Sequence, residues 1–322
     1  MEKLKYTYSQ LSSHSVSELV SSFFSLQTIK SCKYYVLGLH DNYLIEDNAC
    51  KYILRIYRND WRSPEEIYFE LELLTFLNSK GISVAFPIPT ITGELSFCIN
   101  SPEGKRMAAI FPYAQGTAPG NGISPEQSHL LGSAVASAHQ TANRFETKYS
   151  KKSLDISYLL DDSIRAIERF LDSEAQRYMK SLQKELKEAL PMIPKDSEVY
   201  GICLGDVNPS NFHINSENKI TLFDFDQCGH GYRAFEVGKF ISSIHSIERK
   251  QDVARSFIDG YQKIRRLNHD ELRAIPYFEI ISVIWVMAIH AYNANRVGYK
   301  LLKNPFWHRR LAIIKQLESL LT

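Results

Sequence analysis

Apolar and polar residues change their spacing about one third of the way along the chain. In the first third, short runs rich in apolar and aromatic residues are separated by turn residues, as in strands joined by tight turns. These strand-like runs cover residues 33–46, 51–57, 96–99 and 107–113. The turn residues between them are those at 46–48, 91–94 and 101–104. The sequence therefore predicts several strands before residue 115.

Helical spacing marks the rest of the chain and one segment of the first third. Ser63, Pro64 and Glu66 form a helix start, because serine caps, proline fits the first turn and glutamate completes a capping box. The helix is expected to end near Ser79, before Gly81. A second start of this kind lies at residues 124–127, and a short helix is expected at 15–26. Further helices are predicted at 155–171, 173–189, 234–247, 250–265, 270–297 and 306–321.

Residues 116–122 contain small and flexible side chains and form the best candidate boundary. We therefore expect two domains, residues 1–115 and 116–322. The first would be a small strand-rich lobe and the second a larger helical lobe, which is an α+β fold with the two-lobed layout of protein kinases.

Composition narrows the class of protein. The chain has 322 residues, 44% hydrophobic and 23% charged, which suits an ordinary soluble globular protein. A net charge of +2 predicts no nucleic-acid or membrane partner by bulk attraction. Five scattered cysteines without a Cys-x-x-Cys pair argue against a zinc ribbon and favour a reducing, cytoplasmic compartment.

The chain starts with residues that lack an apolar signal core. Its longest apolar stretch, 280–289, is too short to span a bilayer, and we interpret it as a buried helix.

The polar residues between 201 and 240 carry the candidate chemistry. Asp206 stands five residues before Asn211, and Asp224 follows the apolar run 220–223. A loop aspartate can accept a proton from an attacking hydroxyl, while amide and carboxylate oxygens are ligands that magnesium prefers. This spacing favours transfer of a phosphoryl group from a magnesium–nucleotide, with Asp206 as the catalytic base.

Simpler roles exist for each of these residues. Asp206 beside a glycine could be a turn residue, and Asn211 could cap a turn. Asp226 would point to the same side as Asp224 if the chain stayed extended. It could then be a second metal ligand, a group that supports the first, or a solvated loop carboxylate.

The segments GDVNPSNF and LFDFDQCGHGYRAFEVGKF resemble the aminoglycoside phosphotransferase/choline kinase superfamily. The resemblance covers roughly residues 35–300, with a layout similar to its homoserine kinase and stress response kinase A branches. It implies that Asp206 is the catalytic aspartate and that Asn211 and Asp224 are magnesium ligands. Glu236 would take the place of a structural aspartate that supports the catalytic loop.

The resemblance also implies roles in the first third of the chain. Arg55 stands where many members have the lysine that holds the nucleotide phosphates, and Glu70 where its partner glutamate lies. The stretch from Gly38 to Asn42 is the candidate turn over the phosphates, with His40 either a phosphate contact or a surface residue. Backbone groups around Phe111 and Tyr113 would bind adenine.

Two positions depart from the family pattern. Leu204 replaces the histidine before Gly-Asp, which would remove a hydrogen bond but keep the packing. Arg55 replaces lysine; a guanidinium can still hold phosphate, with different reach and geometry.

We therefore expect an ATP- and Mg²⁺-dependent phosphotransferase that acts on a small-molecule hydroxyl. The alternatives are a catalytically weakened pseudokinase that acts by protein contact, and a Ser/Thr protein kinase of the stress response type. The resemblance places the acceptor near the helix that carries Trp285 and Tyr292, which could line a pocket or belong to the core. The sequence leaves the acceptor and the oligomeric state open.

Overall fold

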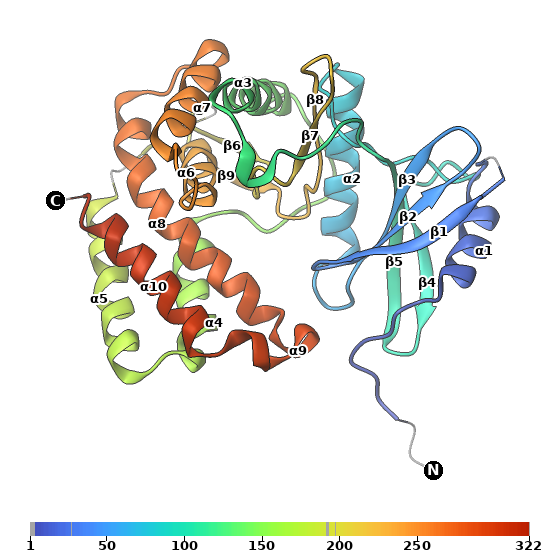
Figure 1. Ribbon diagram of the computed structural model, residues 1–322, viewed down its shortest axis with the longest axis horizontal. Helices are drawn as coiled ribbons and strands as arrows, with labels where there is room; N and C mark the ends of the chain where they lie inside the picture. The colour runs from blue at the N-terminus through green and yellow to red at the C-terminus, as the bar shows by residue number, and fades with distance from the viewer. Residues whose placement is uncertain (1–3, 27, 191–192, 197, 322) are drawn as a thin grey trace. The chain divides into compact units, whose positions relative to one another are not determined.

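The computed structural model describes residues 4–26, 28–190, 193–196 and 198–321 (Figure 1). The chain divides into two units with the main boundary between Gln115 and Gly116. The first unit consists of Met1–Gln115, Phe145–Lys151 and Thr221–Phe223, and the second of Gly116–Arg144, Lys152–Ile220 and Asp224–Thr322. Two short segments from later in the chain thus belong to the first unit.

The first unit is built on one antiparallel sheet in the order β1-β2-β3-β5-β4. Its strands are β1 (Ser31–Leu37), β2 (Asp41–Glu46), β3 (Lys51–Ile56), β4 (Phe97–Ser101) and β5 (Gly104–Pro112), and its helices are α1 (Ser13–Phe23) and α2 (Pro64–Ser79). The predicted run 33–46 is therefore two strands joined by a turn, and the first helix begins two residues earlier than expected because Ser12 caps it.

The two faces of this sheet pack against different helices. Leu54 and Ile56 of β3 belong to a buried cluster that includes Val16 and Val20 of α1. Side chains alternate along a strand, so Arg55 points to the opposite face, where it contacts α2 through Glu70. This arrangement explains why a charged residue sits in the middle of an apolar strand.

The second unit is mainly helical. Its longer helices are α3 (Pro125–Ala142), α5 (Ser173–Ala189), α6 (Arg233–Ser243), α7 (Lys250–Ile264), α8 (His269–Tyr292) and α10 (Asn304–Glu318). The shorter elements are α4 (Ser163–Ile167), α9 (Ala294–Val297) and the strands β6 (Tyr200–Cys203), β7 (Phe212–Ile214), β8 (Ile220–Leu222) and β9 (Gly229–Tyr232). Thr221 and Leu222 of β8 are among the residues assigned to the first unit. β6 pairs with β9, so the two strands that flank Asp206, Asn211 and Asp224 in the sequence are held together.

The capping signals at Ser63 and Ser124 are confirmed, since both helices begin with a complete capping box. The prediction of a single helix over 155–171 is wrong. A wider π turn at Ser157–Asp162 precedes α4, and a 3₁₀ turn at Glu168–Phe170 follows it. Three successive residues, Tyr158 to Leu160, are buried there. A wider turn brings consecutive side chains closer to one face, which a regular α-helix does not.

α8 contains the long apolar stretch. Among the described residues it is the one helix with the length and hydropathy to cross a membrane, and 56% of that stretch is buried inside the protein. Its fully buried residues include Ile280, Ile284 and Trp285, as in the core helix of a folded protein. The predicted helix 270–297 is interrupted at Asn293, where α8 ends and α9 follows.

Candidate active site

The loop after β6 carries Asp206 and lies directly against the segment after β8. Gly205 has a φ of +91°, and a Cβ at this position would lie 2.1 Å from the backbone oxygen of Gln227. Only glycine tolerates both the conformation and the contact. The two polar motifs of the sequence therefore meet within the second unit.

Two side chains hold the carboxylate of Asp206. The ammonium of Lys239 lies 2.7 Å from Oδ1, and the Nδ2 of Asn211 donates to Oδ2 at 3.0 Å. The same Nδ2 donates to the backbone carbonyl of Asp206 at 2.9 Å. The Asp206 side chain keeps 33% of its surface exposed. The carboxylate is thus fixed in orientation and still accessible.

Electrostatics keep this carboxylate charged. Partial burial acts to raise the pKa of Asp206, but the Lys239 ammonium and the amide groups of Asn208 and Asn211 outweigh it, and the pKa lies below its ordinary value. Asp206 is therefore a ready acceptor of hydrogen bonds at neutral pH.

The amide of Asn211 has a defined orientation. Both atoms that it contacts on Asp206 are acceptors, so its nitrogen must face them and its oxygen must point elsewhere. Asp224, half-buried, has a left-handed φ of +64° directly after the apolar run. Aspartate tolerates this conformation better than most residues. An amide oxygen and a carboxylate are a donor set that fits magnesium.

Asp226 lies in different surroundings from those expected. The chain is not extended at Asp224, so the condition under which both carboxylates point to one side is not met. Asp226 is 2% exposed and accepts a hydrogen bond from Nε2 of Gln227 at 3.0 Å. It is a buried carboxylate, and the interpretation as a solvated loop residue is wrong.

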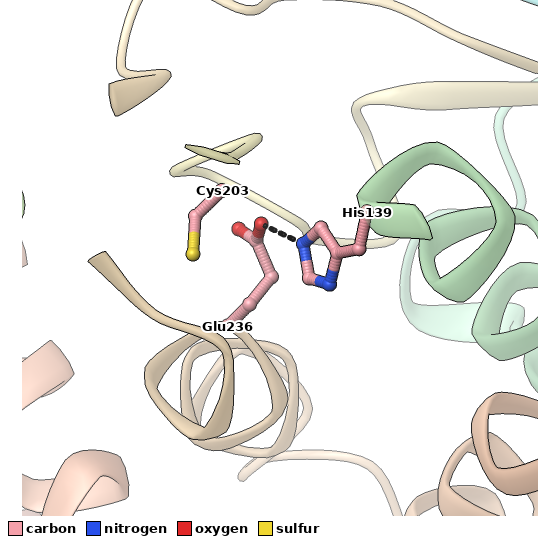
Figure 2. Close-up of side chains that lie close together, drawn as sticks. All are labelled: His139, Cys203 and Glu236. Atoms are coloured by element: carbon pink, nitrogen blue, oxygen red, sulfur yellow. Dashed lines mark hydrogen bonds and ion pairs between the residues drawn. The ribbon is translucent and has the colours of Figure 1, made fainter. Parts of the chain in front are cut away.

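Glu236 of α6 holds the backbone of this loop through hydrogen bonds. Its Oε2 accepts from the backbone N–H of Leu204 at 2.5 Å, and its Oε1 from that of Gly205 at 2.7 Å. His139 of α3 lies 3.0 Å from Oε2 through its Nε2 (Figure 2). Glu236 is fully buried. The backbone just before Asp206 is therefore held by a charged acceptor.

The hydrogen-bond chain continues beyond His139. Its Nδ1 lies 2.8 Å from the hydroxyl of Tyr261, which is 3.4 Å from NH1 of Arg265. Burial lowers the pKa of His139, although Glu236 opposes this. A neutral imidazole can donate from Nε2 to the carboxylate and accept from the tyrosine at Nδ1.

Cys203 lies beside this pair, and side-chain atoms of His139, Cys203 and Glu236 fall within 4.8 Å of one another, a spacing compatible with a metal ion (Figure 2). We interpret the cluster as a structural brace instead. Both oxygens of Glu236 already accept backbone N–H groups. Burial also raises the pKa of Cys203 well above its ordinary value, so the thiol is neutral and a poor ligand.

In the first unit, Arg55 and Glu70 form the ion pair that the resemblance implied. NH1 of Arg55 lies 3.2 Å from Oε1 of Glu70, and their side chains are 11% and 0% exposed. The hydroxyl of Tyr57 lies 3.4 Å from Oε2. Lys151, whose side chain is 1% exposed, approaches the same oxygen at 4.0 Å. Glu70 therefore has a second cation from a distant part of the chain.

The turn predicted to cover the phosphates, from Gly38 to Asn42, has a buried centre. His40 is 3% exposed, and its Nδ1 accepts from the backbone N–H of Arg58 at 3.1 Å. The interpretation of His40 as a surface residue is therefore wrong. The carbonyl of His40 accepts from the N–H of Gly38 at 3.2 Å and from Nδ2 of Asn42 at 3.5 Å, which ties the turn to itself.

The residues predicted to bind adenine lie at the end of β5. Phe111 pairs with Ile53 of β3, and its ring centroid is 5.6 Å from the guanidinium carbon of Arg55. The backbone N–H of Tyr113 donates to the carbonyl of Lys51 at 2.9 Å. Because that N–H is already paired, the adenine prediction depends on other backbone groups of this segment.

Trp285 and Tyr292 lie on the same helix in different surroundings. Trp285 is 1% exposed and packs edge-on against Phe235, with ring centroids 5.8 Å apart. It is a core residue in this structure. Tyr292 is 39% exposed, and its hydroxyl lies 3.4 Å from the carbonyl of Asp162.

Sequence reasoning missed Lys239 and Lys151. Lys239 follows Glu236 by three residues, a spacing that places both on one face of a helix. That signal was present in the sequence. Lys151 lies more than eighty residues from Glu70, and no local pattern links the two.

Comparison with known proteins supports these assignments of fold and class. The phosphotransferase enzyme family matches residues 37–275. An uncharacterized protein of Synechocystis is 38% identical over 97% of this chain and 87% of its own length. The homoserine kinase of Rhizobium meliloti is 24% identical over 74% of this chain and 71% of its own.

The structure of an amicoumacin kinase in complex with AMP-PNP and Ca²⁺ is similar in fold. The TM-score is 0.78 at 20% identity, over 95% of this chain and 93% of that one. The kinase-like α+β fold predicted from the sequence is confirmed. The chain belongs to the phosphotransferase enzyme family, whose members act on small molecules.

Proposed function

We propose that this protein transfers the γ-phosphoryl group of ATP to a hydroxyl group of a small molecule. The observation that carries the proposal is the fixed, accessible carboxylate of Asp206, held by Lys239 and Asn211 in the second unit. The names of the relatives, a homoserine kinase and an amicoumacin kinase, support an acceptor with a hydroxyl group.

In this proposal Asp206 accepts a hydrogen bond from the acceptor hydroxyl, orients it, and takes its proton as the new oxygen–phosphorus bond forms. The bond between the γ-phosphorus and its bridging oxygen breaks in the same step, and ADP leaves. Its orientation is set before the acceptor arrives, so little reorganisation is needed. Asn211 and Asp224 would hold magnesium through oxygen atoms, and the bound ion supplies positive charge that offsets the charge of the phosphates. In the first unit, Arg55 would bind phosphate oxygens while Glu70 fixes its guanidinium.

Neither departure from the family pattern favours the pseudokinase alternative. Leu204 is 6% exposed and its N–H donates to Glu236, so the loop keeps a brace without a histidine at that position. Arg55 forms its ion pair with Glu70 despite the change from lysine.

A protein-kinase role has less support, because only eleven residues separate Asp224 from Glu236, too few for a long activation segment.

The test replaces Asp206 by asparagine. We expect Asp206→Asn to lower acceptor-dependent turnover by about 10²–10⁴-fold, because the general base is lost. Mg–ATP affinity should stay within about threefold of wild type, since this side chain is not a proposed ligand of the nucleotide. ADP release is measured with a panel of homoserine, an amino alcohol, a sugar and an aminoglycoside.

The matched control is Glu279→Gln, which also removes a carboxylate paired to a lysine, Lys250, at 2.5 Å. This control should keep turnover. Wild-type turnover in Asp206→Asn would show that Asp206 is not the base.

A further inference from the structure

Lys239 is a buried cation that, in the proposed reaction, only orients Asp206. Its side chain is 4% exposed, and it reaches Asp206 from α6. Within the described part of the chain, the Asp206 carboxylate is the polar partner that the structure gives to its ammonium. An ammonium has three N–H donors. Buried donors are nearly always paired, so a group with one acceptor is poised for further oxygen atoms.

The position of this ammonium beside Asp206 indicates that the further oxygen atoms belong to the reacting groups. An acceptor hydroxyl bound to Asp206 would lie about 2.6–3.2 Å from the carboxylate. In a reactive complex its oxygen lies about 3–3.5 Å from the atom it attacks. The ammonium of Lys239 lies 2.7 Å from Oδ1 of the same carboxylate, so an oxygen bound at Asp206 would lie close to this ammonium.

The charges at the site also favour a contact between Lys239 and a negatively charged oxygen of the substrate. An incoming phosphoryl group is negative and would be repelled by an isolated carboxylate. The pair of Lys239 and Asp206 is close to neutral at 2.7 Å, so it removes most of that repulsion. A lysine is well suited to this role because it presents a compact charge with rotatable donors.

We propose that Lys239 donates hydrogen bonds to a negatively charged oxygen of the substrate beside Asp206, which makes it a further catalytic residue. The oxygen belongs either to the transferring phosphoryl group or to an anionic group of the acceptor. This inference rests on the proposed function. The competing view is that Lys239 only orients Asp206.

The test compares Lys239→Met, which keeps length and removes charge, with Lys239→Arg, which keeps charge. We measure kcat, the KM for the acceptor, and ATP hydrolysis without an acceptor. Lys239→Met should lower kcat/KM by about 10²–10³-fold, as does the loss of one electrostatic donor at other reacting centres. Lys239→Arg should recover at least about tenfold of this loss.

The pattern of the loss distinguishes the two sources of the oxygen. If Lys239 contacts the phosphoryl group, Lys239→Met lowers hydrolysis and transfer together. If it contacts the acceptor, KM for an anionic acceptor rises while hydrolysis is unchanged. A role confined to orienting Asp206 predicts a fall in kcat that is equal for neutral and anionic acceptors, with hydrolysis unchanged, and would overturn the proposal.

Lys250→Met is the matched control, because Lys250 pairs with Glu279 between α7 and α8 and lies outside the proposed site. Melting temperatures identify variants that unfold, and Lys239→Gln replaces Lys239→Met if that variant does not fold. An active wild-type protein with kinetics unchanged in Lys239→Met would contradict this inference alone. A wild-type protein that neither transfers a phosphoryl group to any acceptor nor hydrolyses ATP would contradict the proposed function as well.

Discussion

At the scale of single residues, the candidate site depends on close contact between two backbone segments. Gly205 allows the loop of Asp206 to touch the backbone of Gln227. Leu204 contributes its N–H where the family pattern has a histidine, and the imidazole in this region comes instead from His139 on α3. Backbone groups thus hold this loop in place, and a motif defined by side chains alone does not include them.

The close contact at Gly205 predicts that adding a single methyl group there destabilises the protein. Gly205→Ala should destabilise the protein by about 3 kcal/mol or more, because the Cβ meets a backbone oxygen at 2.1 Å and φ is +91°. Gly81→Ala is the control, since Gly81 has a similar φ of +82° with nothing within 4 Å of its Cβ. It should cost only about 1–2 kcal/mol, the backbone penalty. Equal losses in urea unfolding would show that the steric contact is unimportant.

At the scale of elements, α6 is the part that organises the second unit's polar groups. Glu236 holds the backbone at 204–205, and Lys239, one turn later, holds the Asp206 side chain. The capping boxes and the helix starts were predictable because they depend on neighbouring residues. The role of Lys239 was harder to predict, since a lysine on an amphipathic helix is usually a solvated residue.

α8 and α10 contain a group that links stability to pH. His290 of α8 packs edge-on against Phe306 of α10, with ring centroids 5.1 Å apart. Burial, together with the charge of Arg310, lowers the pKa of His290 to about 4. In the unfolded chain its pKa is about 6.5.

Between pH 6.5 and pH 4 the unfolded chain therefore binds a proton at His290 that the folded protein does not. Stability is complete above pH 6.5 and falls as the pH drops through this window. We expect His290→Gln to reduce the loss of unfolding free energy between pH 7 and pH 4.5 by about 2 kcal/mol. His269→Gln, at a side chain that is 81% exposed, should leave the loss unchanged. Parallel pH profiles of wild type and His290→Gln in urea unfolding would refute this assignment.

At the scale of the whole molecule, the order of strands and helices was predictable, because each depends on local periodicity and turn residues. The assignment of residues 145–151 and 221–223 to the first unit was not. It depends on contacts such as that of Lys151 with Glu70, and on hydrogen bonds between residues 83–85 and Leu222, which join distant parts of the chain.

The central claim is a magnesium-dependent nucleotide site with Asp224 as a ligand. Calorimetric titration of ATP, with and without Mg²⁺, into wild type and Asp224→Ala tests it most directly. We predict that wild type binds ATP at least tenfold more tightly with Mg²⁺ and that Asp224→Ala loses this difference, because a carboxylate ligand is removed. Asp206→Asn should keep it. Equal Mg²⁺-dependent binding by wild type and Asp224→Ala would contradict the proposed metal site, and no ATP binding in any condition would contradict the phosphotransferase account itself.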